Sequence, residues 1–169
     1  FGSGIVIPLL KDRLADASKV ENYRAITLCS VISKVFELCV LDKFDVFFHT
    51  SDLQFGFKTG IGCAQAINLM QEVTRFFNKR GSTVFLTALD ASKAFDRLSH
   101  CIMFDKLIAC NTPSCLIRCL LAWYDRLVSC VRWNNCLSDQ FKVSAGVRQG
   151  GVLSPTLFNI YVNDLITEL

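Results

Sequence analysis

Asp90 is the residue whose type and position most directly suggest chemistry. It follows residues 83–89, an apolar run rich in β-branched and aromatic residues that predicts a buried strand. A carboxylate at the end of a buried strand is costly unless it is paired or binds a cation. Residues 90–96 therefore indicate a metal site, a hydrogen-bonded cluster or the mouth of a functional site. An aspartate that merely caps the next turn explains this position too.

A second segment, residues 145–155, places three glycines before a predicted helix start. Glycine lets the backbone approach a ligand closely, and a helix that begins at Ser154 offers unpaired N–H groups and the positive end of its dipole. Arg148 and Gln149 could donate hydrogen bonds to a phosphate or to a base. An ordinary turn that leads into a helix fits the same residues, so they leave both interpretations open.

Strands and helices that would position these segments can be read from the hydrophobic pattern. Residues 5–11 predict an edge strand because Pro8 interrupts them, and residues 23–28 predict another extended piece. A helix from Val31 should bury an apolar face, with Glu37 pointing elsewhere. The residues expected on that face are Val31, Val35, Leu38 and Leu41.

Later residues predict further helices over 64–77, from Ser99 to about 110, over 114–127 and from Ser154 onward. Residues 131–133 and 140–143 predict a hairpin around Asn134-Asn135. Strands and helices do not alternate regularly, so the sequence favours an α+β fold over a doubly wound α/β fold.

The composition is that of a folded domain. Of 169 residues, 51% are hydrophobic and 20% charged, which excludes a disordered or low-complexity chain. The net charge of +3 permits a polyanionic partner without requiring one. No apolar stretch is long enough to span a membrane, and no targeting signal is visible. The chain begins at Phe1 and stops at Leu169 within an apolar pattern, so we expect a piece of a longer protein.

Nine cysteines are present, with no Cys-x-x-Cys spacing and only two histidines. This pattern fits neither a zinc site nor a disulfide scaffold. We expect reduced cysteines that act as small buried hydrophobic residues in an intracellular protein.

Taken together and in order, five motifs resemble the reverse transcriptases of non-LTR (LINE-type) retrotransposons. The resemblance covers nearly the whole chain. The motifs are Ile-Val-Ile-Pro at 5–8, Tyr-Arg-Ala-Ile at 23–26, Gln-Phe-Gly-Phe at 54–57, residues 89–96, and residues 146–155 with Phe158 and Asn163-Asp164.

The resemblance implies a partial right-hand polymerase. Residues 1 to about 80 would form mainly the fingers, and residues from about 81 to 169 mainly the palm, an antiparallel sheet backed by helices. It implies an RNA-directed DNA polymerase that uses two Mg²⁺ ions, an RNA template, a DNA primer and deoxynucleoside triphosphates. It also implies a cytoplasmic and nuclear location with no membrane partner.

For the metal, the resemblance makes Asp90 the first metal-binding aspartate and the carbonyl oxygen of Ala91 a further ligand. Mg²⁺ prefers hard oxygen ligands, so carboxylates suit it better than the abundant thiols. The family's Tyr-x-Asp-Asp hairpin is absent from this sequence. We therefore expect the chain alone to be inactive.

For the nucleotide, the resemblance assigns phosphate contacts to Lys11 and Arg24 and backbone N–H donors to residues 93 and 94. Phe95 would be the steric gate that excludes a 2′-hydroxyl, and plain core packing is the alternative role for this ring. Lys11 fits a solvated strand end equally well, and Ala25 departs from the family's usual proline. The full nucleotide-binding set is Lys11, Arg24, Lys93, Ala94, Phe95, Gln149 and Gly150.

An alternative interpretation is a degenerate retroelement remnant or a non-catalytic RNA-binding module. The intact motif residues Asp90, Phe95, Gln149 and Gly150 argue against decay. A purely structural α+β domain does not account for five motifs in order.

Overall fold

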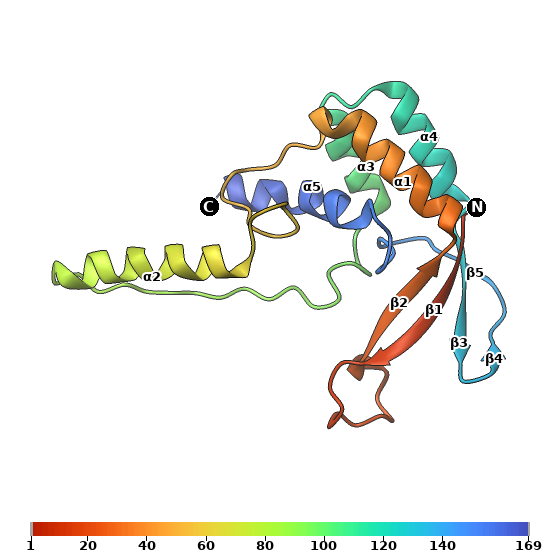
Figure 1. The fold of residues 1–169 in the computed structure, drawn as a ribbon, viewed down its shortest axis with the longest axis horizontal. Coiled ribbons are helices and arrows are strands. Elements are labelled where there is room, and N and C mark those ends of the chain that lie inside the picture. The colour runs from red at the N-terminus through yellow and green to blue at the C-terminus, as the bar shows by residue number, and fades with distance from the viewer. Residues whose placement is uncertain (1, 169) are drawn as a thin grey trace.

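The computed structural model describes residues 2–168 and has a mixed α+β fold, which confirms the predicted class (Figure 1). The strands are β1 (Ser3–Leu10), β2 (Tyr23–Cys29), β3 (Val128–Trp133), β4 (Cys136–Leu137) and β5 (Phe141–Lys142). The helices are α1 (Val31–Phe44), α2 (Cys63–Lys79), α3 (His100–Ala109), α4 (Ser114–Asp125) and α5 (Ser154–Thr167). Short 3₁₀ helices lie at Val20–Asn22 and Asp45–Phe47.

The sheet has the strand order β2-β1-β3-β4, and β5 also pairs with β3. β1 and β2 form an antiparallel pair from Gly4↔Cys29 to Leu10↔Tyr23, whereas β1 and β3 are parallel from Ser3↔Val128 to Val6↔Val131. β1 is thus a central strand, and the predicted edge position is wrong for its first half. Pro8 lies beyond the stretch paired with β3, where the missing N–H removes no hydrogen bond from the ladder.

The β3–β4 hairpin turns at Asn134-Asn135 as predicted, with Trp133 opposite Cys136. Asn134 has a φ of 54°, a left-handed conformation that asparagine tolerates better than most residues. β5 pairs with the beginning of β3 at Val128 and Ser129. This pairing lies farther from the turn than residues 131–133, where the sequence pattern predicts it.

The hydrophobic core lies among α1, α3, α4 and α5, which gather at one end of the sheet (Figure 1). Burying each of its large side chains stabilises the fold by about 1.5–3 kcal/mol. The largest fully enclosed apolar side chains are Leu98, Met103, Leu107, Leu120, Leu127, Leu153 and Leu157.

The buried face of α1 differs from the predicted one. Val31, Val35 and Leu38 are exposed, while Ser33, Glu37 and Val40 are buried. Glu37 can be buried on this face because Arg148, 111 residues later in the chain, pairs with it inside the protein. The apolar pattern of α1 alone gives no sign of that partner.

α2 projects away from the other helices, and the chain returns alongside it without regular structure (Figure 1). The predicted buried strand over 83–89 is wrong for this structure. Phe85 and Leu89 are 90% and 79% exposed. A strand needs a neighbouring strand for its N–H and C=O groups, and no strand among residues 2–168 lies beside this segment.

The cysteines are free thiols, but the expectation of buried cysteines is also wrong. Cys29, Cys110 and Cys130 are partly buried, and the other six are exposed. Several lie on outward-facing helix positions where neighbouring Leu and Ile side chains suggested a core. Among the described residues, no helix is long and apolar enough to cross a membrane.

Candidate functional site

The two segments singled out in the sequence lie against each other. The Gly146 N–H donates to the Leu98 carbonyl oxygen at 2.7 Å, and the Val147 N–H donates to the Phe95 carbonyl oxygen at 2.8 Å. Gly146 has a φ of +82°, and a Cβ atom there would lie 2.7 Å from the Phe95 oxygen. Glycine at position 146 is what allows this close approach.

A cavity of about 420 Å³ lies where this junction meets the sheet. Four of the predicted nucleotide-binding residues line it, from the end of β1, from β2, from the turn before α3 and from the loop before α5. They are Lys11, Arg24, Lys93 and Gln149. The other lining residues are Val6, Pro8, Val20, Tyr23, Ala25, Asp96 and Val131.

The cavity carries a net positive charge on a largely apolar wall, since three of its lining side chains are basic and Asp96 is its one acidic side chain. Lys11 Nζ donates to the Glu21 carbonyl oxygen at 2.7 Å, which holds the lysine across the β1–β2 connection. Lys93 has a φ of 53°, a strained conformation for a residue with a Cβ atom. A wall of this charge suits a ligand with several negative charges.

Gln149 and Gly150 lie beside the free edge of β2, where Gln149 forms a parallel bridge with Ile26. The Thr27 N–H donates to the Gln149 carbonyl oxygen at 2.6 Å, and Gln149 Nε2 donates to Asp96 Oδ1 at 3.4 Å. Gly150 has a φ of +123° and is not among the residues that line the cavity. The loop therefore presents the Gln149 amide to the cavity and keeps the Gly150 backbone against Thr27.

Phe95 and Ala94 are partly buried and do not line the cavity. The Phe95 ring packs edge-on against Phe158, with centroids 4.9 Å apart, and is tilted against Phe57 at 5.7 Å. The Phe158 contact places the ring against the hydrophobic core, whereas the Phe57 ring is exposed. The structure thus shows the packing role of this ring, and the gate role stays a prediction.

Asp90 and Ala91 lie on the exposed, irregular stretch that returns from α2 and are absent from the cavity. A divalent ion such as Mg²⁺ needs several oxygen ligands in near-octahedral geometry. Within residues 2–168, no group of three or more His, Cys, Asp or Glu side chains could hold a metal ion. The described residues therefore do not form a complete metal site.

Arg148 does not reach the cavity, so the idea that it donates to a phosphate or a base is wrong. Its Nη2 donates to Glu37 Oε1 at 2.9 Å and to Ser33 Oγ at 2.8 Å. The guanidinium lies over the Trp123 ring at 4.8 Å from the centroid and is 7% exposed. A buried cation needs such partners to offset its lost hydration.

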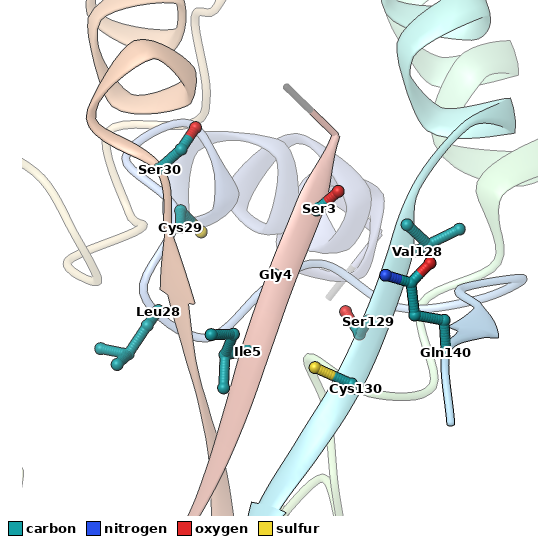
Figure 2. A pocket seen from close by; sticks show the side chains of 10 residues that line it. All are labelled: Ser3, Gly4, Ile5, Leu28, Cys29, Ser30, Val128, Ser129, Cys130 and Gln140. Carbon is teal, nitrogen blue, oxygen red and sulfur yellow. The ribbon is translucent and has the colours of Figure 1, made fainter. Parts of the chain in front are cut away.

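A separate cavity of about 460 Å³ lies at the other end of the same strands, beside the start of β1 (Figure 2). It contains none of the predicted site residues. Cys29 lines it, and burial raises the pKa of this thiol, with smaller and opposing effects of the Arg148 and Glu37 charges. A protonated thiol is a poor nucleophile and a poor metal ligand, so Cys29 does not give this cavity a reactive group.

Sequence reasoning misses the parts of the site that depend on distant pairing. It gives Asp96 no definite role, yet this residue lines the cavity and accepts the Gln149 amide. It treats Tyr23 only as a neighbour of Arg24, yet Tyr23 also lines the cavity. It places Glu37 on the outer face of its helix, and the partner Arg148 is 111 residues away. The one signal in the sequence is a lone glutamate among apolar residues, which is common on exposed helices.

Comparisons with known proteins confirm the family resemblance. Residues 11–169 match the family described as reverse transcriptase (RNA-dependent DNA polymerase). The retrovirus-related Pol polyprotein from type-2 retrotransposable element R2DM of Drosophila melanogaster is 28% identical over 153 residues, covering 90% of this chain and 14% of that protein.

Two further relatives show the same relation. The probable RNA-directed DNA polymerase from transposon X-element of Drosophila melanogaster is 30% identical over 150 residues, covering 85% of this chain and 16% of that protein. The RNA-directed DNA polymerase from mobile element jockey of Drosophila funebris is 29% identical over 154 residues, with 86% and 16% covered. The chain thus spans only about one-sixth of the length of these relatives.

Proposed function

The chain belongs to the reverse transcriptase family of non-LTR retrotransposons, and we propose that it forms the deoxynucleotide-binding part of an RNA-directed DNA polymerase. One observation carries this proposal: Lys11, Arg24, Lys93 and Gln149 line a single cavity although four separate segments supply them. A single ligand site accounts for why these four side chains, from separate parts of the sequence, line one cavity.

The cavity would act through its own charges and hydrogen-bond donors. Lys11, Arg24 and Lys93 would attract the triphosphate, because fixed cations in a partly enclosed site bind a polyanion without reorganising. Gln149 would contact the sugar or base. Holding the nucleotide in one orientation is a large part of what a polymerase must supply.

The wider assignments are also proposals. Residues 1 to about 80 would belong mainly to the fingers and the rest mainly to the palm, with an RNA template and a DNA primer as partners. The family uses a divalent metal, for which Asp90 and the Ala91 carbonyl oxygen are proposed donors. Because the described residues do not complete a metal site, the nucleotide cavity is the part of the proposal that this chain can test directly.

The test is a titration of the ¹⁵N-labelled chain with dGTP, followed by ¹H–¹⁵N NMR. We expect saturable shifts at residues 24, 93 and 149, and about tenfold weaker binding in Arg24→Gln and Lys93→Gln. Arg75→Gln is the matched control, because Arg75 lies on the projecting helix α2. Wild-type shifts that are absent, or equal losses in all three variants, would overturn the proposal.

A second titration with an RNA–DNA primer–template separates the polymerase interpretation from the RNA-binding module. We expect weak binding whose affinity falls steeply with salt, since it depends on phosphate contacts. Tight binding of RNA that is indifferent to salt, with no response to dGTP, would favour the module instead.

A further inference from the structure

Glu37 is a buried carboxylate. Both of its oxygens accept hydrogen bonds, and these bonds join three parts of the molecule. Glu37 is 1% exposed, and its Oε1 accepts from Arg148 Nη2 at 2.9 Å and from Ser33 Oγ at 3.2 Å. Its Oε2 accepts from the Leu153 N–H at 2.8 Å, at the start of α5. One side chain on α1 therefore holds both ends of the loop segment that runs from Arg148 to Leu153.

The loop is fitted closely around this carboxylate. A Cβ atom at Gly151 would lie 3.1 Å from Glu37 Oε2 and 2.5 Å from Ser154 Oγ, so the backbone passes directly beside the acid. The Gly151 N–H also donates to the Arg148 carbonyl oxygen at 3.0 Å. The segment is thus closed into a turn whose inner side is the Glu37 carboxylate.

Arg148 is joined directly to a residue of the cavity. The next residue, Gln149, forms an isolated parallel bridge with Ile26 of β2 and lines the cavity. The ion pair that holds Arg148 therefore also restrains the backbone from which the Gln149 side chain enters the cavity, although Arg148 itself does not reach the cavity.

We propose that Glu37 is a positioning residue for the nucleotide cavity: by anchoring Arg148 and the Leu153 N–H, it fixes Gln149 and Gly150 in place against β2. The choice of a nucleotide as the ligand rests on the proposed function, whereas the anchoring of the loop by Glu37 does not. The competing explanation is a purely structural ion pair that contributes only to stability.

The experiment uses the whole chain, dGTP as the probe, and two measurements. The first is the hydrogen-exchange rate of the Thr27 N–H, which donates to the Gln149 carbonyl oxygen and so reports loop position without any ligand. The second is the dGTP affinity measured by NMR titration. The thermal midpoint is recorded for each variant.

Glu37→Gln keeps the size of the side chain and removes its charge. We expect hydrogen exchange at the Thr27 N–H to accelerate at least about tenfold relative to exchange at Ile7, a reference amide on β1. We also expect the dGTP affinity to fall about tenfold. Leu116→Ala, which truncates a core side chain on α4, is the control variant: it lowers the thermal midpoint, as Glu37→Gln should, without touching the loop. It should leave dGTP affinity and the exchange ratio within about twofold of wild type.

A double variant, Glu37→Gln with Arg148→Met, separates the effect of Glu37 on loop position from its effect on protein stability. Removing both charges avoids an unpaired buried ion, so we expect the thermal midpoint to recover above that of Glu37→Gln. The dGTP affinity and Thr27 protection should stay low, because nothing then anchors residue 148.

Each outcome has a definite meaning. If affinity and Thr27 protection recover together with stability in the double variant, or if Leu116→Ala loses them equally, Glu37 is only structural and the inference is wrong. If wild type fails to bind dGTP, the proposed function fails. Thr27 exchange then still decides whether Glu37 positions the loop.

Discussion

A Cβ atom at Gly150 would lie 2.5 Å from the carbonyl oxygen of Thr27. This distance is far inside van der Waals contact, and Gly150 also has a φ of +123°, which side chains rarely adopt. Only glycine therefore lets the loop before α5 approach the edge of β2 this closely.

We predict that Gly150→Ala lowers the free energy of unfolding by about 1–3 kcal/mol, because strain and overlap act together. Gly60→Ala is the matched control, since Gly60 has a φ of +77° but no atoms within 4 Å of its Cβ position. It should cost only about 1 kcal/mol. Urea denaturation of both variants measures the difference, and equal losses would contradict the close approach.

Phe95→Val tests whether the Phe95 ring only packs in the core or also selects the sugar of the nucleotide. Loss of contact with Phe158 should lower the free energy of unfolding by about 1–2 kcal/mol, less than for a fully buried ring. If Phe95 is also the gate, the ratio of dGTP to GTP affinity should fall. Phe158→Leu is the control, because it loosens the same packing without removing the Phe95 ring. An unchanged ratio in Phe95→Val means that the ring is only part of the core.

Asp90→Asn should leave the fold of this chain unchanged, since Asp90 lies on the exposed stretch outside the core. We expect a thermal midpoint within about 1 °C of wild type, as for most surface substitutions. Mn²⁺, added as a paramagnetic probe, should broaden the residue 90 amide only at millimolar concentration, because one carboxylate binds a divalent ion weakly. Tight Mn²⁺ binding near residue 90 would show that the donor set is more complete than the structure indicates.

Alkaline pH should destabilise the protein. Burial raises the pKa of the Tyr124 phenol and of the Cys29 and Cys110 thiols. The folded state therefore favours the protonated forms. These groups contribute stability fully below the unfolded pKa values of about 9 for a thiol and 10 for a phenol, and the contribution is lost as pH rises above them.

For Tyr124 the loss should be about 1.4 kcal/mol per pH unit above pH 10. Unfolding free energies measured at pH 7, 9 and 10.5 test this. Tyr124→Phe should resemble wild type at pH 7 and lose less stability at pH 10.5. The same slope in both proteins would mean that the phenol ionises without unfolding the chain.

Local patterns predict the local structure well. The 3.6-residue spacing of Ile67, Met70, Val73 and Phe77 locates α2, and Asn134-Asn135 locates the turn of the β3–β4 hairpin, because these features depend on neighbours in sequence. The motif resemblance predicts one nucleotide site for a set of residues that are far apart in the chain. Four members of that set do line one cavity, namely Lys11, Arg24, Lys93 and Gln149.

The failures all concern long-range partners. The buried position of Glu37 requires Arg148, and the irregular path of residues 83–89 reflects the absence of a neighbouring strand among residues 2–168. Apolar composition favours burial, but it cannot say which surface will cover a segment. The same reasoning explains why the cysteines among leucines and isoleucines are exposed.

The parallel pairing of β1 with β3 joins Ser3 to Val128, 125 positions later in the chain. β2 follows β1 closely, so the β1–β2 hairpin can form early during synthesis. The open edge of β1 can pair only after β3 has been synthesised. At ribosomal rates of about 5–20 residues per second, this takes roughly ten seconds. During that interval an unpaired strand edge is exposed to other nascent chains. We therefore expect slower translation of residues 10–131 to prolong the exposure of this strand edge.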